Sequence, residues 1–397
     1  MGRVETDWTA AAEAARDDLI ALRRAIHAEP ELGLECPKTR DKLEASLAGL
    51  PLTIRRSERS SGFVATLEGA RPGRSVLLRG DMDALPIREA TGLAFASREE
   101  GRMHACGHDS HSAMLASAVR ILCARRDAIE GSVHFMFQPG EEGHHGARVM
   151  IEEGLLGDPL PDAAFALHIW PTLDHAKVAC RAGAMLASTD TLKARIAGKG
   201  GHAAMPHDAR DPIPVAAEII LALQSEVARR VPVADPMVLS ITSIHAGETH
   251  NVLPESVDLL GTLRTLSPAG RQHGREAFDR ICSLVAAAHG CQAEVEIVPG
   301  YPPTINDPRA VGLIRDIAGE AFAEFPAPSM GGEDFSYVLE RVPGAMAFLG
   351  VAAPGNNAAA SAPLHNPAMM IDEDVLPLGV ALHCAFATRF LAEGWGK

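Results

Sequence analysis

Three short apolar segments of the sequence each end in side chains that bind metal ions or carry protons. Residues 75–79 run into GDMDALP, residues 132–138 run into PGEEG, and residues 163–169 have His168 near their end. Their composition predicts buried strands, and the carboxyl ends of such strands open onto the crevice in which α/β proteins hold their sites. We therefore expect an α/β fold in which successive strands deliver acid, acid and imidazole at their carboxyl ends.

The stretch HACGHDSH, residues 104–111, holds the densest group of metal ligands in the chain. Gly107 permits the turn that a Cys and a His two positions apart need in order to bind one ion. We predict a helix over residues 113–123, with Asp109 or Ser110 as its cap, so that the ligands lie on a loop at a helix N-terminus. Surface loops also collect polar residues, but this mixture favours a metal site. The group consists of His104, Cys106, His108, Asp109 and His111.

The first two strand ends carry pairs of carboxylates. Asp81 and Asp83 are two apart on an extended chain and therefore point the same way, although a polar turn closed by Pro86 is an alternative interpretation. Glu141 and Glu142 are adjacent between glycines, so their side chains diverge. One can bind a metal while the other faces a water molecule, which is the division of roles that metal-assisted hydrolysis requires.

The pattern of elements changes near residue 188. Residues 191–298 read as strand, helix, strand, strand, helix and strand, which is the split βαβ arrangement of a small independent domain. Two polar motifs lie within it, GKGGHAAMPH and HNVLPE. Because α/β character resumes afterwards, we predict an inserted domain over residues 188–298 between the two parts of a larger one, residues 1–187 and 299–397.

Charge and cysteine content exclude several classes of function. The formal net charge of −14 opposes binding to nucleic acid or to an anionic membrane. Seven scattered cysteines without a paired spacing indicate a reducing compartment. The amino-terminal segment carries acidic residues where an export signal needs an apolar core, and residues 375–387 are too short to span a bilayer. We therefore expect a cytoplasmic protein.

Five residues from separate parts of the chain form a mixed set of thiolate, imidazole and carboxylate donors: Cys106, His108, Glu142, His168 and His365. His365 lies between two prolines, and a surface position is an equal alternative for it. Zinc suits such donors, while manganese, cobalt and nickel are alternatives. Two ions about 3.5–4 Å apart can activate water and polarise a carbonyl, so the set indicates hydrolysis. Motifs for a serine nucleophile, a P-loop or a dinucleotide site are absent from the sequence.

The order of motifs resembles a known family. GDMDALP, HACGHD, GEEG, LHIWP, GKGGHAAMPH, HNVLPE, GTLRT, GGEDFS and PLHNP occur as in the aminoacylase and carboxypeptidase metallohydrolases, over nearly the whole chain. The branch of hippurate hydrolases, N-acyl-amino-acid amidohydrolases and auxin-conjugate hydrolases is the most similar. This resemblance implies a mostly parallel central sheet with helices on both faces and an inserted ferredoxin-like lid that forms homodimers or homotetramers.

The resemblance also assigns roles to individual residues. It implies that Cys106 bridges the ions, that Glu141 is the general base, and that Asp83 orients a metal-binding imidazole. His202 matches a lid histidine that binds the scissile carbonyl. Asn251 and Arg264 match positions near the substrate's carboxylate, and a guanidinium can grip a carboxylate with two hydrogen bonds. A surface ion pair is the alternative role for Arg264.

One departure concerns the number of ions. Many family members carry His-x-Asp where this chain has Asp81-Met82-Asp83, so either Asp81 replaces that imidazole or the site holds fewer tightly bound ions. We expect one or two divalent ions per subunit. The expected reaction is hydrolysis of hippurate-like N-acyl-L-amino acids by metal-activated water, with Glu141 as base. The alternatives are a dipeptidase or exopeptidase on the same scaffold and a non-catalytic carboxylate-binding protein that keeps the metal for stability.

Overall fold

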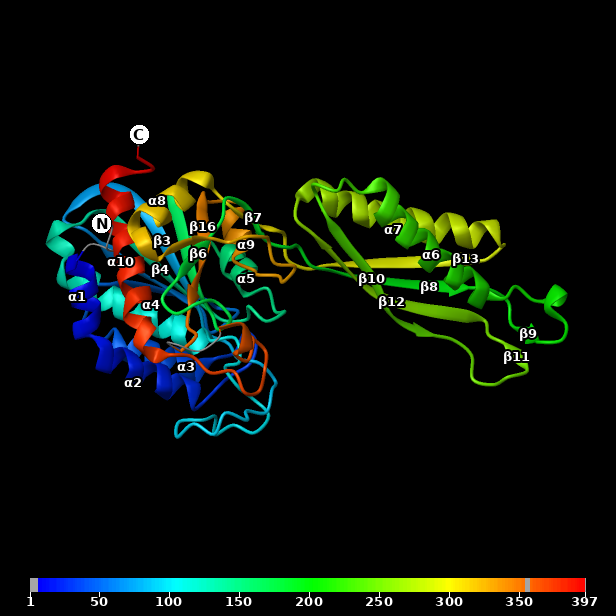
Figure 1. Ribbon diagram of the computed structural model, residues 1–397, viewed down its shortest axis with the longest axis horizontal. Helices are drawn as coiled ribbons and strands as arrows, with labels where there is room; N and C mark the ends of the chain where they lie inside the picture. The colour runs from blue at the N-terminus through cyan, green and yellow to red at the C-terminus, as the bar shows by residue number, and fades with distance from the viewer. Residues whose placement is uncertain (1–5, 354–357, 397) are drawn as a thin grey trace. The chain divides into compact units, whose positions relative to one another are not determined.

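The computed structural model describes residues 6–353 and 358–396, and these fall into two compact units (Figure 1). Unit 1 comprises Met1–Gly183, Ile305–Ala327 and Asp334–Lys397, and unit 2 comprises Ala184–Thr304 and Pro328–Glu333. Unit 2 is thus inserted in sequence between parts of unit 1. Residues 1–5 of the segment expected to lack an export signal lie outside the described residues.

Unit 1 is built on a mixed eight-stranded sheet of order β1-β2-β4-β3-β5-β16-β6-β15. The four central strands, β4, β3, β5 and β16, are all parallel, which confirms the expected α/β fold with a mostly parallel centre. Long apolar runs such as VHFMF in β4 are typical of strands buried on both faces. The strands are β1 Thr53–Arg56, β2 Phe63–Glu68, β3 Arg71–Asp81, β4 Glu130–Gln138, β5 Ala163–Trp170, β6 Val178–Cys180, β15 Phe322–Glu324 and β16 Gly344–Gly350.

The helices of unit 1 flank its central sheet. Helices α1, α2 and α3 precede residue 48, and α8 ends at Ala318, where a short 3-10 turn and β15 follow it. Helices α4 and α10 pack against each other and against the central strands, where they bury the main hydrophobic core. The helices are α1 Thr6–Ala14, α2 Arg16–His27, α3 Pro37–Ser46, α4 His108–Ala124, α5 Gly146–Glu152, α8 Pro308–Ala318, α9 Ser336–Leu339 and α10 Leu376–Glu393.

The carboxyl-terminal helix is longer than the sequence suggested. The run Glu373–Glu393 has the length and composition of a membrane span, so the expectation that this segment is too short was wrong. However, 78% of its most apolar window is buried inside the protein. Contacts of α10 with α4, α1 and strand β3 account for that apolar composition.

Unit 2 contains a four-stranded antiparallel sheet of order β10-β12-β8-β13, with α6 and α7 along one face (Figure 1). Residues alternate between buried and exposed along β8, because only one face of the sheet is covered. Asp211 and Ser267 cap α6 and α7 by accepting hydrogen bonds from backbone amides. The elements are β8 Asp190–Ala197, α6 Pro212–Arg230, β10 Met237–His245, β12 Ser256–Thr265, α7 Pro268–Ala288 and β13 Gln292–Pro299.

Four further short strands lie near the ends of unit 2. Strands β9 (Gly201–His202) and β11 (Val252–Leu253) pair with each other and carry the GKGGHAAMPH and HNVLPE motifs. Strands β7 (Gly183–Leu186) and β14 (Thr304–Asn306) fall at the two boundaries of the inserted segment.

Candidate metal centre

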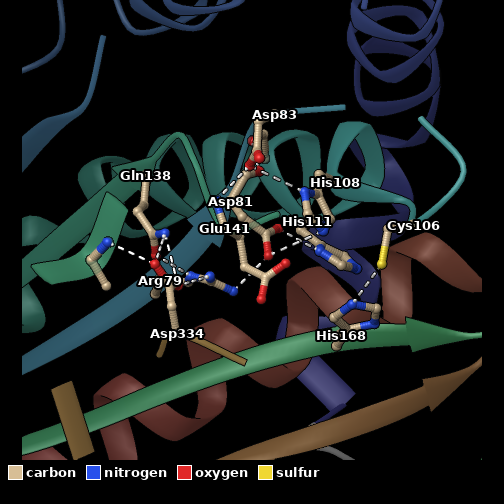
Figure 2. A network of polar contacts seen from close by, with 12 residues as sticks. Arg79, Asp81, Asp83, Cys106, His108, His111, Gln138, Glu141, His168 and Asp334 are labelled. Atoms are coloured by element: carbon tan, nitrogen blue, oxygen red, sulfur yellow. Dashed lines mark hydrogen bonds and ion pairs between the residues drawn. The ribbon is translucent and has the colours of Figure 1, made fainter. Parts of the chain in front are cut away.

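The carboxyl ends of strands β3, β4 and β5 lie side by side in unit 1. Strand β3 pairs in parallel with β4 and with β5, and Asp81 is in register with Gln138 at the strand ends. The loop after β4 carries Glu141, and β5 carries His168. The expected convergence of two acidic strand ends and an imidazole is therefore confirmed, and Figure 2 shows these side chains facing one another.

The turn before α4 brings a thiol and an imidazole together. Gly107 adopts φ +83, the left-handed conformation that glycine tolerates, and α4 begins at the next residue. A Cβ atom on Gly107 would lie 2.4 Å from Ile169 Cγ1, so the loop can approach β5 this closely only without a side chain. The helix begins five residues earlier than expected.

The expected cap of α4 was wrong. Asp109 and Ser110 lie inside the first turn, and the cap position is Gly107, which makes no side-chain capping bond. Asp109 is fully buried and accepts hydrogen bonds at 2.8 Å from Arg23 Nε and from His27 Nδ1. Tertiary partners thus use the carboxylate that a local pattern would assign to capping.

The five predicted ligands lie together in unit 1. Donor atoms of Cys106, His108 and His168 all lie within 4.8 Å of one another, and the same holds for Cys106, Glu142 and His365. The thiol belongs to both groups, which is the position that a bridging ligand needs. A tetrahedral or higher coordination shell for one or two ions can be assembled from these donors.

The unpaired atoms of this cluster fit a cation. Among the described residues, neither ring nitrogen of His108 nor the buried Glu142 Oε1 makes a hydrogen bond of good geometry. Their polar neighbours are ion-pair contacts: Asp83 and Asp81 lie 3.4 and 3.5 Å from the two ring nitrogens, and His365 lies 3.2 Å from Glu142 Oε1. His168 Nδ1 donates to the carbonyl of Ile169 at 2.6 Å, so the lone pair of its Nε2 remains available 3.5 Å from Cys106 Sγ. Buried polar atoms without partners are rare, and an ion would satisfy these.

Burial and charge set the proton affinities of the cluster. Burial raises the pKa of the Cys106 thiol well above its ordinary value and lowers the pKa of His168 well below it. For His108, burial lowers the pKa but Asp81 and Asp83 raise it more, to about 10. The carboxylates around this imidazole therefore favour a positive charge, which a metal ion supplies as well as a proton does.

His365 approaches the cluster from a separate loop. Its backbone lies at φ +63, which is uncommon for a residue with a side chain, and its Nε2 is 3.2 Å from Glu142 Oε1. The side chain is 53% exposed. The structure thus brings His365 to Glu142. His365 is therefore not an isolated surface histidine.

The two adjacent glutamates have different surroundings. Asp83 accepts hydrogen bonds from the backbone amides of Glu141 and Glu142, at 3.0 and 3.1 Å, and its Oδ1 lies 3.4 Å from His108 Nδ1. The Glu141 carboxylate is buried and within 4.8 Å of donors on His108 and Glu142. Asp83 therefore holds both the glutamate loop and an imidazole in place.

Asp81 makes bonds that sequence reasoning did not foresee. Arg79 Nη1 donates to its Oδ2 at 2.6 Å, and His111 Nδ1 lies 2.6 Å from its Oδ1 (Figure 2). Burial would raise the pKa of Asp81, but Arg79, His108 and His111 hold it well below the ordinary value. Arg79 also donates to Gln138 at 2.8 Å and to Asp334 at 3.1 Å.

A local signal for this network exists in part. Arg79 stands in an apolar strand two positions before Asp81, and a charge in a buried strand requires a partner on the same face. Asp334 belongs to the GGEDFS motif, but nothing local indicates that it meets Arg79.

The remaining predicted residues belong to unit 2. His202 is exposed on β9, and its Nδ1 accepts a hydrogen bond from the backbone amide of Ala204 at 3.1 Å. Asn251 is also exposed. Its backbone carbonyl accepts a hydrogen bond from the amide of Ala203, the residue after His202, so the two predicted residues lie near each other. Arg264 is partly buried on β12 and donates from Nε to Thr262 Oγ1 at 3.2 Å, and burial lowers its pKa.

Comparisons with known proteins agree with this arrangement. The model of peptidase family M20/M25/M40 matches residues 77–389. The IAA-amino acid hydrolase ILR1-like 2 of Arabidopsis thaliana is 38% identical over 390 residues, which is 96% of this chain and 87% of that protein. The N-acetyl-L-cysteine deacetylase of Bacillus subtilis (strain 168) is 39% identical over 360 residues, 90% of this chain and 84% of that protein.

A solved structure gives the same result. The Bacillus subtilis YXEP protein, described as a dinuclear metal binding peptidase from the M20 family, matches with a TM-score of 0.83 and 32% identity. The match covers 96% of this chain and 99% of that chain. The resemblance noted in the sequence is confirmed: the chain belongs to peptidase family M20/M25/M40 and is a metal-dependent amidohydrolase.

Proposed function

We propose that this protein hydrolyses the amide bond of N-acyl-L-amino acids and releases a carboxylate and a free amino acid. The observation that carries the proposal is the pair Glu141 and Glu142, of which one reaches the Cys106 and His365 donors while its neighbour lies beside His108. The relatives named as hydrolases of IAA–amino acids and of N-acetyl-L-cysteine support the same class of substrate.

In this proposal, Cys106, His108, Glu142, His168 and His365 would hold the divalent ions, which would supply polarisation of a water molecule and of the amide carbonyl. Glu141 accepts a proton from the attacking water and passes it to the nitrogen of the leaving amino acid. Asp83 keeps Glu141 in place through the backbone amide. His202 donates to the carbonyl oxygen as negative charge develops there.

The donor set supports one or two ions per subunit. His108, His168 and Cys106 form one group, and Glu142, His365 and Cys106 form the other. Manganese or zinc is the proposed native metal, with cobalt or nickel as alternatives, because imidazole and thiolate suit these borderline cations.

The finer substrate assignment concerns the amino-acid end. Arg264 is partly buried, and among the described residues its guanidinium has a hydroxyl partner but no carboxylate within ion-pair distance. Such a guanidinium suits the α-carboxylate of a substrate, with Asn251 as a second contact. A hippurate-like aromatic acyl group is the proposed preference at the other end.

Self-association through unit 2 is part of the proposal. Among the described strands, β10 pairs only with β12, and its outer edge is therefore open to a second copy. Val233, Leu221 and Ile244 are 98%, 71% and 50% exposed in this unit. A homodimer, or a homotetramer built from it, would cover such an edge.

The seven cysteines are free and buried, which suits the proposed cytoplasmic setting.

An amide panel tests the function. Purified protein loaded with Mn²⁺ or Zn²⁺ is assayed with benzoyl-glycine, N-acetyl-cysteine and an auxin–amino acid conjugate, with release of the amino acid as the readout. We expect turnover that a chelator abolishes and added metal restores. Turnover that survives complete metal removal would contradict the proposal.

Two alternatives have their own outcomes. The YXEP relative is described as a peptidase, so glycyl-glycine is included in the panel. Faster cleavage of glycyl-glycine than of benzoyl-glycine at equal metal loading would favour an exopeptidase. Absence of turnover on every amide, combined with a rise in Tm on adding small carboxylates, would favour a non-catalytic binding protein.

A further inference from the structure

His111 lies at the metal centre but is absent from the proposed ligand set. It is buried on α4, one turn after His108, and its ring centroid is 4.3 Å from that of His168. One of its ring nitrogens also lies within 4.8 Å of a carboxylate oxygen of Asp81 and a ring nitrogen of His108. By residue type and position alone, His111 would be a further metal ligand.

The hydrogen bonds of His111 give it a different role. Its Nε2 lies 2.9 Å from the backbone nitrogen of Ile169, and because an amide N–H can only donate, Nε2 must accept. The proton of the neutral ring is then on Nδ1, which donates to Asp81 Oδ1 at 2.6 Å. Both nitrogens are therefore used, and neither has a lone pair left for a metal ion.

Asp81 is itself held rigidly. Its second oxygen accepts from Arg79, and the side chains of both residues are at most 1% exposed. Arg79 is fixed by Gln138 and Asp334, and Asp334 in turn accepts from the amide of Ala147 at the start of α5. The orientation of His111 is thus set by a buried network that spans β3, β4 and α5 (Figure 2).

Ile169 connects His111 to the proposed ligands. Its amide donates to His111, and its carbonyl accepts from His168 Nδ1, so the backbone on both sides of this residue is fixed. Its side chain also packs against Gly107, next to Cys106. A shift of Ile169 would therefore move His168 and the Cys106 loop together.

We propose that His111 is a positioning residue, which transmits the fixed orientation of Asp81 to Ile169 and so aims His168 Nε2 at Cys106, and that it does not bind the metal. The inference rests on the proposed ligand set. A positioning role for His111 differs from a ligand role in two measurable quantities: the number of ions bound at saturation and the tautomer of the His111 ring.

Three substitutions separate the two hydrogen bonds. The amide of H111N can replace the Nδ1 donor to Asp81, that of H111Q can replace the Nε2 acceptor for Ile169, and H111A replaces neither. We expect all three variants to bind as many Zn²⁺ ions at saturation as the parent protein. We expect the Kd for Zn²⁺, measured by chelator competition, to rise about 10- to 100-fold in H111A and H111N and less in H111Q.

Two control variants show what loss of a ligand and loss of an unrelated imidazole look like. H168A removes a proposed ligand and should lower the number of ions at saturation. H134Q removes an imidazole that bonds Thr66 on the outer part of the sheet, and should leave the Kd unchanged. With Co²⁺ bound, the thiolate-to-cobalt band and the visible spectrum should keep their shape in H111Q. Loss of an ion at saturation in the His111 variants, or an unchanged Kd in all three, would overturn the proposal.

A measurement on the metal-free parent protein tests the tautomer of His111 directly. In the metal-free protein labelled with ¹⁵N-histidine, we expect His111 to be neutral with its proton on Nδ1, and the signals missing in H111N identify it. A charged ring, or a proton on Nε2, would overturn the inference. If the parent protein bound no divalent ion, the proposed function would fail, while the tautomer would still decide whether His111 joins Asp81 to Ile169.

Discussion

Asp83 Oδ1 lies 3.0 Å from the backbone nitrogen of Glu141, although the two residues are 58 positions apart. Its other oxygen accepts from the amide of Glu142 at 3.1 Å. A carboxylate that accepts two backbone hydrogen bonds fixes the loop that presents both glutamates. The family resemblance assigned Asp83 to an imidazole alone, and the structure adds this second task.

We therefore expect D83N to lower kcat/KM about 10- to 100-fold, the range for substitutions that support a metal site. The amide NH2 group of Asn cannot accept a hydrogen bond, so one of the two glutamate amides loses its partner. Steady-state kinetics at saturating metal measure this. D41N, at an exposed aspartate, is the matched control. Parent-like kcat/KM in D83N would show that the loop holds its shape without this carboxylate.

The adjacent glutamates provide a second prediction. E141Q should lower kcat by about 10²- to 10⁴-fold, as loss of a general base does, while the metal content remains that of the parent. E142Q should instead weaken metal binding, because Glu142 belongs to the Cys106 and His365 group. Kinetics and metal analysis after dialysis measure the two effects. Equal metal loss in both variants would remove the proposed division of roles.

Continuous apolar runs with polar ends explain why much of unit 1 could be predicted. Apolar runs ending in Asp81, Glu141 and His168 showed where buried strands stop, and parallel strands bring such ends to one edge. Gly107 indicated the turn between Cys106 and His108, and the structure places it at φ +83. These features depend on residues close together in sequence.

Long-range pairing explains what could not be predicted. Arg79 and Asp334 are 255 positions apart, and no local pattern indicates which buried charges meet. The start of α4 was misplaced because its first turn is polar, and only the fold supplies the buried partners of Asp109. The same limit applies to His111, whose role depends on an amide of β5.

Arg264 gives a prediction about the substrate's carboxylate. R264Q should raise KM for benzoyl-glycine about 10- to 100-fold, because a hydrogen bond to a charged group contributes about 1.5–3 kcal/mol. The corresponding glycinamide, which lacks the carboxylate, should be a poor substrate for both proteins and show little further loss. R195Q, on the neighbouring strand where Arg195 pairs with Asp258, is the control. An equal loss on both substrates would assign Arg264 a structural role instead.

The last prediction concerns stability and pH. His27 is buried, which lowers its pKa, but Asp109 and then Glu89 raise it more, to about 9. Because the folded pKa lies above the unfolded value of about 6.5, the charged ring stabilises the fold fully below pH 6.5. That contribution, at most about 3 kcal/mol for such a shift, is lost as the pH rises from 6.5 through 9.

H27Q should therefore lower the free energy of unfolding more at pH 6 than at pH 9.5, as measured by urea denaturation at both values. The direction follows from proton binding, since the folded protein keeps the His27 proton over a pH range in which the unfolded chain releases it. H207Q, at an exposed histidine, should leave the pH dependence of the parent unchanged. A loss in H27Q of equal size at the two pH values would mean that packing of the ring, and not its charge beside Asp109, accounts for its contribution.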